Sequence, residues 1–142
     1  MQIKEIMKTD VKIADPNSSV QEAAEEMSKC RIGCLVVVKK ERMVGIITER
    51  DILTRLVAKD LSASKTKTKD IMTTKVVMIE PERDISDAAE IMTKRKIKKL
   101  PVISNDRLVG IVTLVDICAV QPEMIKKAAS LMMLPKKKVI AG

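Results

Sequence analysis

Apolar residues recur with a helical period at two places in the chain. In both, the spacing is i, i+3, i+4 and i+7, which puts the apolar side chains on one face of an α-helix. The positions are Val20, Ala23, Ala24 and Met27 in the first stretch, and Ile85, Ala88, Ala89 and Met92 in the second. Each stretch follows a residue that often caps helices, Ser19 or Asp84. The pattern therefore predicts two helices with one buried face each.

After each helix the pattern changes to apolar runs separated by polar turns, which predicts a hairpin. The predicted strands are 35–38 and 43–48 in the first half and 100–103 and 108–113 in the second, with turns at 39–42 and 104–107. The first strand of each hairpin is continuously apolar, as expected when both faces are covered. Short extended stretches at 11–13 and 76–79 precede the first helices, and further helices are predicted to begin near Thr48 and Thr113.

The two halves repeat the same pattern at a constant separation of 65 residues. Ile6-Met7 returns as Ile71-Met72, Pro16 as Pro81, Val44-Gly45-Ile46 as Val109-Gly110-Ile111, and Asp51-Ile52 as Asp116-Ile117. A constant offset without a gap indicates one structural unit used twice. The predicted fold is mixed α and β, with two strand-helix-strand-strand-helix repeats packed as a pseudo-twofold pair that shares a core.

The repeats set the expected domain boundaries. Residues 1–60 form the first domain and residues 61–121 the second, with a polar linker at about 58–69. Residues 122–142 form a C-terminal extension with a third helical pattern, placed either over its own module or in a dimer interface, and a basic tail.

The composition of the 142-residue chain excludes several classes of function. There is no Phe, Tyr or Trp, so no aromatic platform for stacking bases exists. There is no His, the commonest general base and metal ligand, and no metal site or cofactor for catalysis is predicted. The three cysteines form no CxxC pair and are expected to be reduced thiols. No membrane-spanning run or signal peptide is visible, so we expect a soluble, cytoplasmic protein.

The net charge of +8 is concentrated in the second half of the chain. Residues 1–60 carry 11 basic and 10 acidic side chains, whereas residues 61–142 carry 16 and 9. This asymmetry indicates an anionic partner for the second half.

A Thr followed three residues later by an Asp stands at the end of the last strand in each repeat. The pairs are Thr48 with Asp51 and Thr113 with Asp116. One interpretation is a capping box, in which the two side chains close the start of a helix. The other is a ligand site, in which the helix start and the hydroxyl bind a phosphate and the carboxylate accepts hydrogen bonds from a ribose. The two interpretations are compatible.

The whole pattern resembles a tandem pair of CBS domains, the adenosine-sensing Bateman module. Two copies of strand, proline, helix, an apolar strand of the Leu100-Pro101-Val102 type, and the strand end Gly110-Ile111-Val112-Thr113 followed by Asp116 carry the resemblance, which covers residues 3 to about 121. It implies units packed through their sheets, with two clefts that bind AMP, ADP, ATP or S-adenosylmethionine. It also implies a homodimer of modules and no catalysis.

The resemblance carries the family's site residues to specific positions. It implies Thr113 and Asp116 as phosphate and ribose contacts of the second site, and Thr48 and Asp51 as those of the first.

Basic residues near the apolar strand complete the implied sites. Lys98 and Lys99, just before Pro101, resemble the family's phosphate-contacting pair. The first repeat has Gly33-Cys34 at that place, with Arg50 as a possible substitute cation. The residues at the places that the family uses for adenine are Met7, Lys12, Thr73 and Val77.

The sequence is compatible with three functions. The favoured hypothesis is a non-catalytic regulatory module that binds an adenosine-containing ligand and passes a conformational change to a separate effector protein. The alternative is a nucleic-acid-binding protein that uses the basic second half, with binding that weakens steeply with salt. An enzyme is the third and least favoured, because only carboxylates and lysines would be available for catalysis.

Overall fold

The computed structural model describes residues 1–126 and residue 129. The first repeat consists of β1 (Ile13–Ala14), α1 (Val20–Cys30), β2 (Cys34–Lys39), β3 (Arg42–Thr48) and α2 (Glu49–Arg55). The second repeat contains α4 (Ile85–Arg95), β4 (Lys99–Ser104), β5 (Arg107–Thr113) and α5 (Leu114–Val120). From α1 to α2, each element has a counterpart 65 residues later. The predicted mixed α and β fold with two repeats is therefore confirmed.

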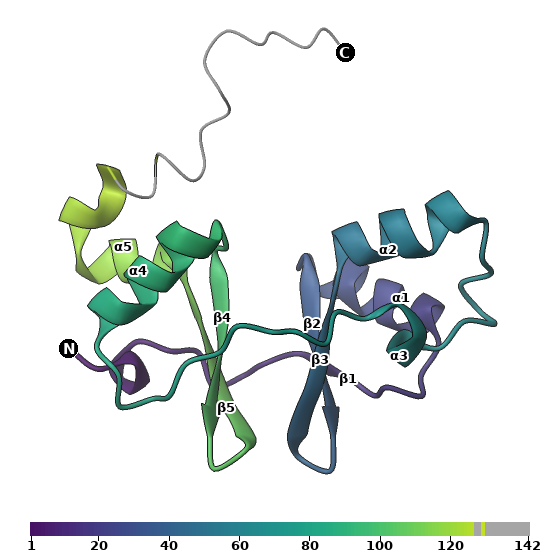
Figure 1. Cartoon of the computed structure of the whole chain (residues 1–142), viewed down its shortest axis with the longest axis horizontal. Helices are drawn as coiled ribbons and strands as arrows, with labels where there is room; N and C mark the ends of the chain where they lie inside the picture. Colours follow the sequence, from purple (N-terminus) through teal and green to yellow (C-terminus); the bar gives the residue numbers. More distant parts are fainter. Residues whose placement is uncertain (127–128, 130–142) are drawn as a thin grey trace, which may run out of the picture.

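The leading segment of each repeat packs on the other repeat. The 3-10 helix η1 (Ile3–Glu5) lies with β4 and β5, whereas α3 (Thr68–Ile71) lies with β2 and β3. Figure 1 shows the purple N-terminal segment crossing from one lobe to the other, and the teal segment after α3 crossing back. We call the lobe that contains β2 and β3 the first lobe and the one that contains β4 and β5 the second. The lobes therefore do not follow the sequence boundary expected near residue 60.

Glycines on the central strands let the crossing segments approach closely. A Cβ atom on Gly110 would lie 2.9 Å from the carbonyl oxygen of Lys8. With glycine there, the N–H of Lys8 donates to the carbonyl of Ile111 and the N–H of Ile111 donates to the carbonyl of Lys8, each at 2.9 Å. Gly45 faces the carbonyl of Thr73 in the same way, at 2.8 Å from the position of a Cβ. The two glycines therefore permit the backbone pairing that joins each repeat to the other lobe.

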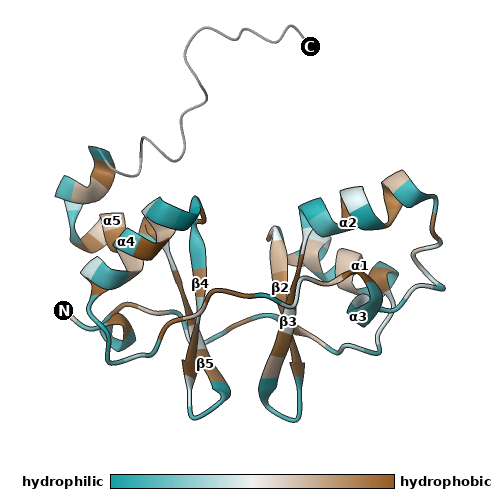
Figure 2. Ribbon diagram, viewed as in Figure 1, coloured by the Kyte–Doolittle hydropathy of each residue, from teal (hydrophilic) through white to brown (hydrophobic). Residues whose placement is uncertain are grey.

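The strands form one sheet in the order β1-β2-β3-β5-β4. Each hairpin closes with a two-residue turn whose residues have positive φ, Lys40-Glu41 in one and Asn105-Asp106 in the other, as in the turns that match strand twist. Both turns are hydrophilic in Figure 2. The hairpins pair at Arg42 and Arg107, and Arg107 forms an ion pair of 3.1 Å with Glu41. The lobes are thus joined near the hairpin turns.

The short strand predicted at 76–79 is reduced to one bridge between Ile79 and Val102. Its counterpart in the first lobe is a two-residue strand, where the N–H of Val36 donates to the carbonyl of Lys12 at 3.3 Å. The residue equivalent to Val36 is Pro101, which has no N–H to donate. The missing donor explains the shorter pairing in the second lobe.

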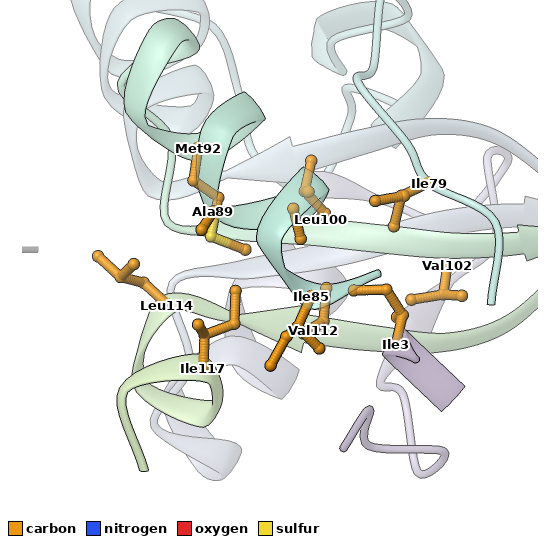
Figure 3. Packing of buried hydrophobic residues seen from close by; sticks show 11 residues of the cluster. Ile3, Ile79, Ile85, Ala89, Met92, Leu100, Val102, Val112, Leu114 and Ile117 are labelled. Atoms are coloured by element: carbon orange, nitrogen blue, oxygen red, sulfur yellow. The ribbon is translucent and has the colours of Figure 1, made fainter. Parts of the chain in front are cut away.

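Each lobe has a separate cluster of buried side chains, so the predicted single shared core is wrong. The second cluster contains Ile3, which is fully buried and comes from the first repeat. Figure 3 shows it beside Val102 and Val112. The first cluster contains Ile71 from the second repeat. Because each core is completed by the other repeat, we expect the lobes to unfold together.

The predicted helix caps are confirmed. Ser19 Oγ accepts from the N–H of Glu22 at 3.1 Å, and Asp84 Oδ2 accepts from the N–H of Ser86 at 2.9 Å. The side-chain hydrogen bond from Ser86 is the main cause that lowers the pKa of Asp84 to about 2.

The described regions outside the repeats contain short helical elements. The predicted linker begins in the 3-10 helix η2 (Val57–Lys59) and ends in α3. The C-terminal extension begins with the 3-10 helix η3 (Pro122–Met124), and most of its predicted helix and its basic tail lie outside the described residues. Within the part of the chain that the structure describes, no helix combines the length and apolar character needed to cross a bilayer.

Replacing Gly110 by Ala should weaken the fold, because the new Cβ forces the Lys8 carbonyl out of its reciprocal pair. We expect the free energy of unfolding to fall by about 1–3 kcal/mol, measured by urea denaturation with far-ultraviolet circular dichroism at one protein concentration. Gly33→Ala is the matched control, since its Cβ meets only the carboxylate end of the flexible Glu49. Equal losses in both variants would contradict the role assigned to Gly110.

Candidate functional site

The capping boxes predicted at the two strand ends are present. Thr48 Oγ1 accepts from the N–H of Asp51, and Asp51 Oδ2 accepts from the N–H of Thr48, both at 3.0 Å. Thr113 and Asp116 make the same two bonds at 3.1 Å. One oxygen of each carboxylate is therefore committed to the helix start, and any ligand contact falls to the other oxygen.

The second carboxylate oxygen has a different partner in each repeat. Asp51 Oδ1 accepts from the hydroxyl of Thr73 at 3.0 Å, with Arg55 Nη1 at 3.7 Å, and its side chain is only 8% exposed. Asp116 Oδ1 lies 3.7 Å from the ammonium of Lys8, and its side chain is 15% exposed. Thr73 and Lys8 are equivalent positions of the two crossing segments. The repeat thus places a neutral donor at one carboxylate and a cation at the other.

Two clefts lie between the repeats, and we name each after its threonine. The Thr48 cleft has a volume of about 490 Å³, within the range of roughly 300–1,000 Å³ of small-molecule sites. Predicted site residues that line it are Thr48, Thr73, Val77, Lys98, Lys99 and Pro101. Lys75 and Lys96 also line it, together with Glu49 as a carboxylate. Cationic side chains therefore outnumber carboxylates in this cleft.

The Thr113 cleft is smaller, with a volume of about 150 Å³. Its lining includes the predicted residues Lys12, Lys99 and Thr113, together with Lys8 and Asp10. As shaped here it is smaller than most ligand sites. A nucleotide would require its walls to move apart.

The remaining predicted site residues do not line either cleft. Asp51 and Asp116 form the capping hydrogen bonds with Thr48 and Thr113, and of these four only the threonines line the clefts. Met7 packs against the second cluster, with its sulfur next to Gly110.

Arg50 is exposed and lines neither cleft. The substitute cation expected from the sequence is therefore not brought to the Thr48 cleft. The lysines of the second repeat supply the positive charge there instead.

The structure places basic residues of the second repeat in the cleft that contains Thr48 of the first. Lys98, which belongs to the second repeat, lines the Thr48 cleft, and Lys99 lines both clefts. Cys34 and Lys99 begin the equivalent strands β2 and β4, and the Lys99 ammonium lies 3.9 Å from the Cys34 sulfur. Burial raises the pKa of the Cys34 thiol, and the charge of Lys99 opposes that rise. The basic pair of the second repeat therefore lines the cleft that contains Thr48 of the first.

Sequence reasoning missed Lys8, Lys75, Lys96 and Cys34. Lys8 is the counterpart of Thr73, so comparing the repeats position by position would have found it. Lys75 stands two residues after Thr73 in an extended segment, which points both side chains to one side. Lys96 is the C-capping residue of α4 and also lines the cleft.

Another hollow, of about 670 Å³, lies between α1 and α2. It is larger than either cleft, but its lining is mainly apolar and includes Leu53 and Val57, which are 62% and 61% exposed. Arg31 and Glu49 are its charged side chains. This lining suits a protein surface better than a nucleotide. Among the described residues, no group of three or more cysteine, aspartate or glutamate side chains is placed to hold a metal ion.

One family model matches both repeats of the chain. The family model described as CBS domain matches the chain twice, over residues 3–58 and 69–123. The chain belongs to the CBS-domain family. Both matches include the threonine and aspartate of their repeat, and the resemblance seen in the sequence is confirmed.

Related proteins match most of the chain. The CBS domain-containing protein YhcV of Bacillus subtilis is 34% identical over 119 residues, which cover 84% of this chain and 84% of YhcV. The uncharacterized protein MK0525 of Methanopyrus kandleri is 32% identical over 125 residues, which cover 87% of this chain and 64% of that relative. The chain thus spans less than two thirds of this second, longer protein.

Two solved structures of CBS-domain proteins with adenosine compounds resemble this fold. The CBS domain pair of protein MJ0100, in complex with 5′-methylthioadenosine and S-adenosylmethionine, has a TM-score of 0.74 and 31% identity, covering 87% of this chain and 97% of that one. Protein PAE2072 from Pyrobaculum aerophilum, complexed with AMP, has a TM-score of 0.77 and 26% identity, covering 91% and 99%.

The different partners of the two aspartates predict different costs of mutation. Thr73→Val leaves a buried carboxylate oxygen of Asp51 without its hydroxyl donor, so we expect a loss of about 1–3 kcal/mol in the free energy of unfolding. Lys8→Met is the matched variant. It leaves the more exposed Asp116 to water, and we expect a loss below about 1 kcal/mol. Urea denaturation of both variants measures the difference, and a larger loss in Lys8→Met would refute it.

Proposed function

We propose that this CBS-domain pair is a non-catalytic regulatory module that binds an adenosine phosphate in the Thr48 cleft. The observation that carries the proposal is the lining of that cleft by two threonine hydroxyls and several lysines. These residues are Thr48, Thr73, Lys75, Lys96, Lys98 and Lys99. Hydroxyl groups and ammonium groups are suited to phosphate oxygens.

The charge of the Thr48 cleft favours AMP, ADP or ATP over S-adenosylmethionine as the ligand. Among the described residues, none of the four lysines that line it forms an ion pair with a carboxylate. Their ammonium groups are therefore available to an anion. S-adenosylmethionine carries a sulfonium cation, which these lysines would repel. The AMP complex of PAE2072 supports a phosphate-bearing ligand in a fold of this kind.

The carboxylates behind the threonines are the proposed ribose contacts. Asp51 and Asp116 each have one oxygen outside the capping box. To bind ribose hydroxyls, Asp51 has to release or share Thr73, and Asp116 has to release Lys8. Both partners belong to the crossing segments, so binding would displace the segment that joins the repeats. Lys12, which lines the Thr113 cleft, and Val77, which lines the Thr48 cleft, are the proposed neighbours of the adenine.

Such a displacement provides the proposed route of regulation. Both clefts have walls from both repeats, so a ligand that fits one arrangement of the lobes better shifts the population toward it. A separate effector protein would respond to that arrangement. We also propose a homodimer, which would cover the exposed Leu53 and Val57 of the hollow between α1 and α2.

The basic run gives less support to the nucleic-acid alternative. Lys94 forms an ion pair of 3.0 Å with Glu90. Lys96, Lys98 and Lys99 line the Thr48 cleft, so they do not form a separate basic ridge.

The proposal is tested by the ultraviolet spectrum of nuclease-treated, high-salt-washed protein, followed by denaturation and chromatography of the released small molecules. Without Phe, Tyr and Trp the protein absorbs little where nucleobases absorb. We expect a released adenosine phosphate or, for protein purified empty, saturable heat of binding on titration with AMP, ADP or ATP. Absorbance that stays polymeric, or no heat with any of these ligands, would overturn the proposal.

Replacing Lys98 by Met should weaken the binding of ATP about tenfold, on the scale of one lost charge-assisted hydrogen bond. Adenosine has no phosphate, and its affinity should be unchanged. Titration calorimetry of the wild type and the variant with both ligands measures the effect. Equal weakening for ATP and adenosine would place Lys98 away from the phosphate.

A further inference from the structure

Lys99 occupies a position that the two clefts share. It lines the Thr48 cleft and the Thr113 cleft, as does Cys34, its equivalent in the first repeat. The Lys99 ammonium and the Cys34 sulfur are 3.9 Å apart. The pair therefore forms the wall between the clefts, with a single cation at a place where two would be expected from strict repetition.

The Thr113 cleft depends on Lys99 more than the Thr48 cleft does. Of the other lysines that line it, Lys8 lies 3.7 Å from Asp116 and Lys12 lies 3.6 Å from Asp10. Within the described part of the chain, Lys99 forms no such ion pair. It is thus the lysine of this cleft whose charge no carboxylate offsets.

The Thr48 cleft has an excess of cations by comparison. Lys75, Lys96 and Lys98 line it in addition to Lys99, with Glu49 as the carboxylate among its lining residues. An anionic ligand is therefore expected to fill the Thr48 cleft first. Its phosphate would draw the Lys99 ammonium to that side of the wall.

We propose that Lys99 is a cation shared by the two clefts, so that an adenosine phosphate in the Thr48 cleft lowers the affinity of the Thr113 cleft for a second one. This inference rests on the proposed function, because both clefts must bind the same class of ligand. The coupling requires no change of fold, since the Lys99 ammonium can pair with only one of two phosphates on opposite sides of the wall. Uncharged adenosine does not need Lys99 and does not take part in the coupling.

Two equivalent isoleucines report on the clefts separately. Ile46 lines the Thr48 cleft and Ile111 lines the Thr113 cleft, each just after the glycine of its strand. The experiment is a titration of AMP into the full chain with ¹³C-labelled isoleucine methyl groups. The shifts of the two methyl signals give a binding curve for each cleft. A parallel titration with adenosine gives the curves without phosphate.

The variant Lys98→Glu distinguishes clefts that are coupled through Lys99 from clefts that bind AMP independently. Lys98 lines the Thr48 cleft and not the Thr113 cleft, so we expect the variant to weaken AMP binding in the Thr48 cleft and to leave Lys99 to the Thr113 cleft. We expect the Ile111 curve for AMP to shift to tighter binding, by up to about tenfold, and the Ile111 curve for adenosine to stay in place. A general loss of positive charge would instead weaken AMP binding at Ile111. An unchanged or weaker Ile111 curve overturns the inference.

Lys99→Met is the second variant of a double-mutant cycle with Lys98→Glu. Because Lys99 is exposed, its replacement should leave the fold intact. We expect it to weaken the Ile111 curve for AMP and to abolish the tightening caused by Lys98→Glu in the double variant. Tightening that persists in the double variant assigns the coupling to another residue. If both methyl signals respond to AMP but the sites are independent, only this inference fails. If neither signal responds to AMP, ADP or ATP, the proposed function fails with it.

Discussion

The close approach of two crossing segments to two glycines is the constraint on which the rest of the structure depends. At Gly45 and Gly110 the backbone of one repeat lies against a central strand of the other, at distances that leave no room for a Cβ atom. The reciprocal hydrogen bonds formed there place Ile3 in one core and Ile71 in the other. A repeat of this size would bury too little surface alone, and the exchange of segments makes each lobe depend on both copies. The same exchange forms the clefts, since the crossing segments supply one wall of each.

Small differences between equivalent positions make the two clefts unequal. Thr73 stands where the other repeat has Lys8, so one carboxylate is held by a hydroxyl and the other by an ammonium group. Cys34 stands where the other has Lys99, so the wall between the clefts carries a single cation. The backbone repeats closely, and the side chains at these positions decide volume and charge. One fold unit used twice thus yields two clefts that differ in volume and charge.

The sequence was sufficient to predict the elements, the hairpins and the capping boxes, because each depends on local spacing or on the repeat itself. It did not predict the exchange of leading segments, since two adjacent copies read the same whether they pack on themselves or on each other. The grouping of Lys98 with Thr48 follows from that spatial arrangement and has no local signal. The position of Arg50 outside the clefts has a related reason: its neighbour Asp51 points inward to cap the helix, whereas Arg50 is exposed. The second short strand was overpredicted because the missing donor of Pro101 lies on its partner strand.

In the proposed complex an adenosine phosphate binds between the repeats, with its phosphate held by the lysines of the second. A crystal structure of the chain grown with AMP tests this most directly. We predict nucleotide density in the Thr48 cleft, with phosphate oxygens within hydrogen-bonding distance of Lys98 or Lys99 and the ribose near Asp51. Nucleotide density in the hollow between α1 and α2, or a Thr48 cleft that stays empty at saturating AMP, would contradict it.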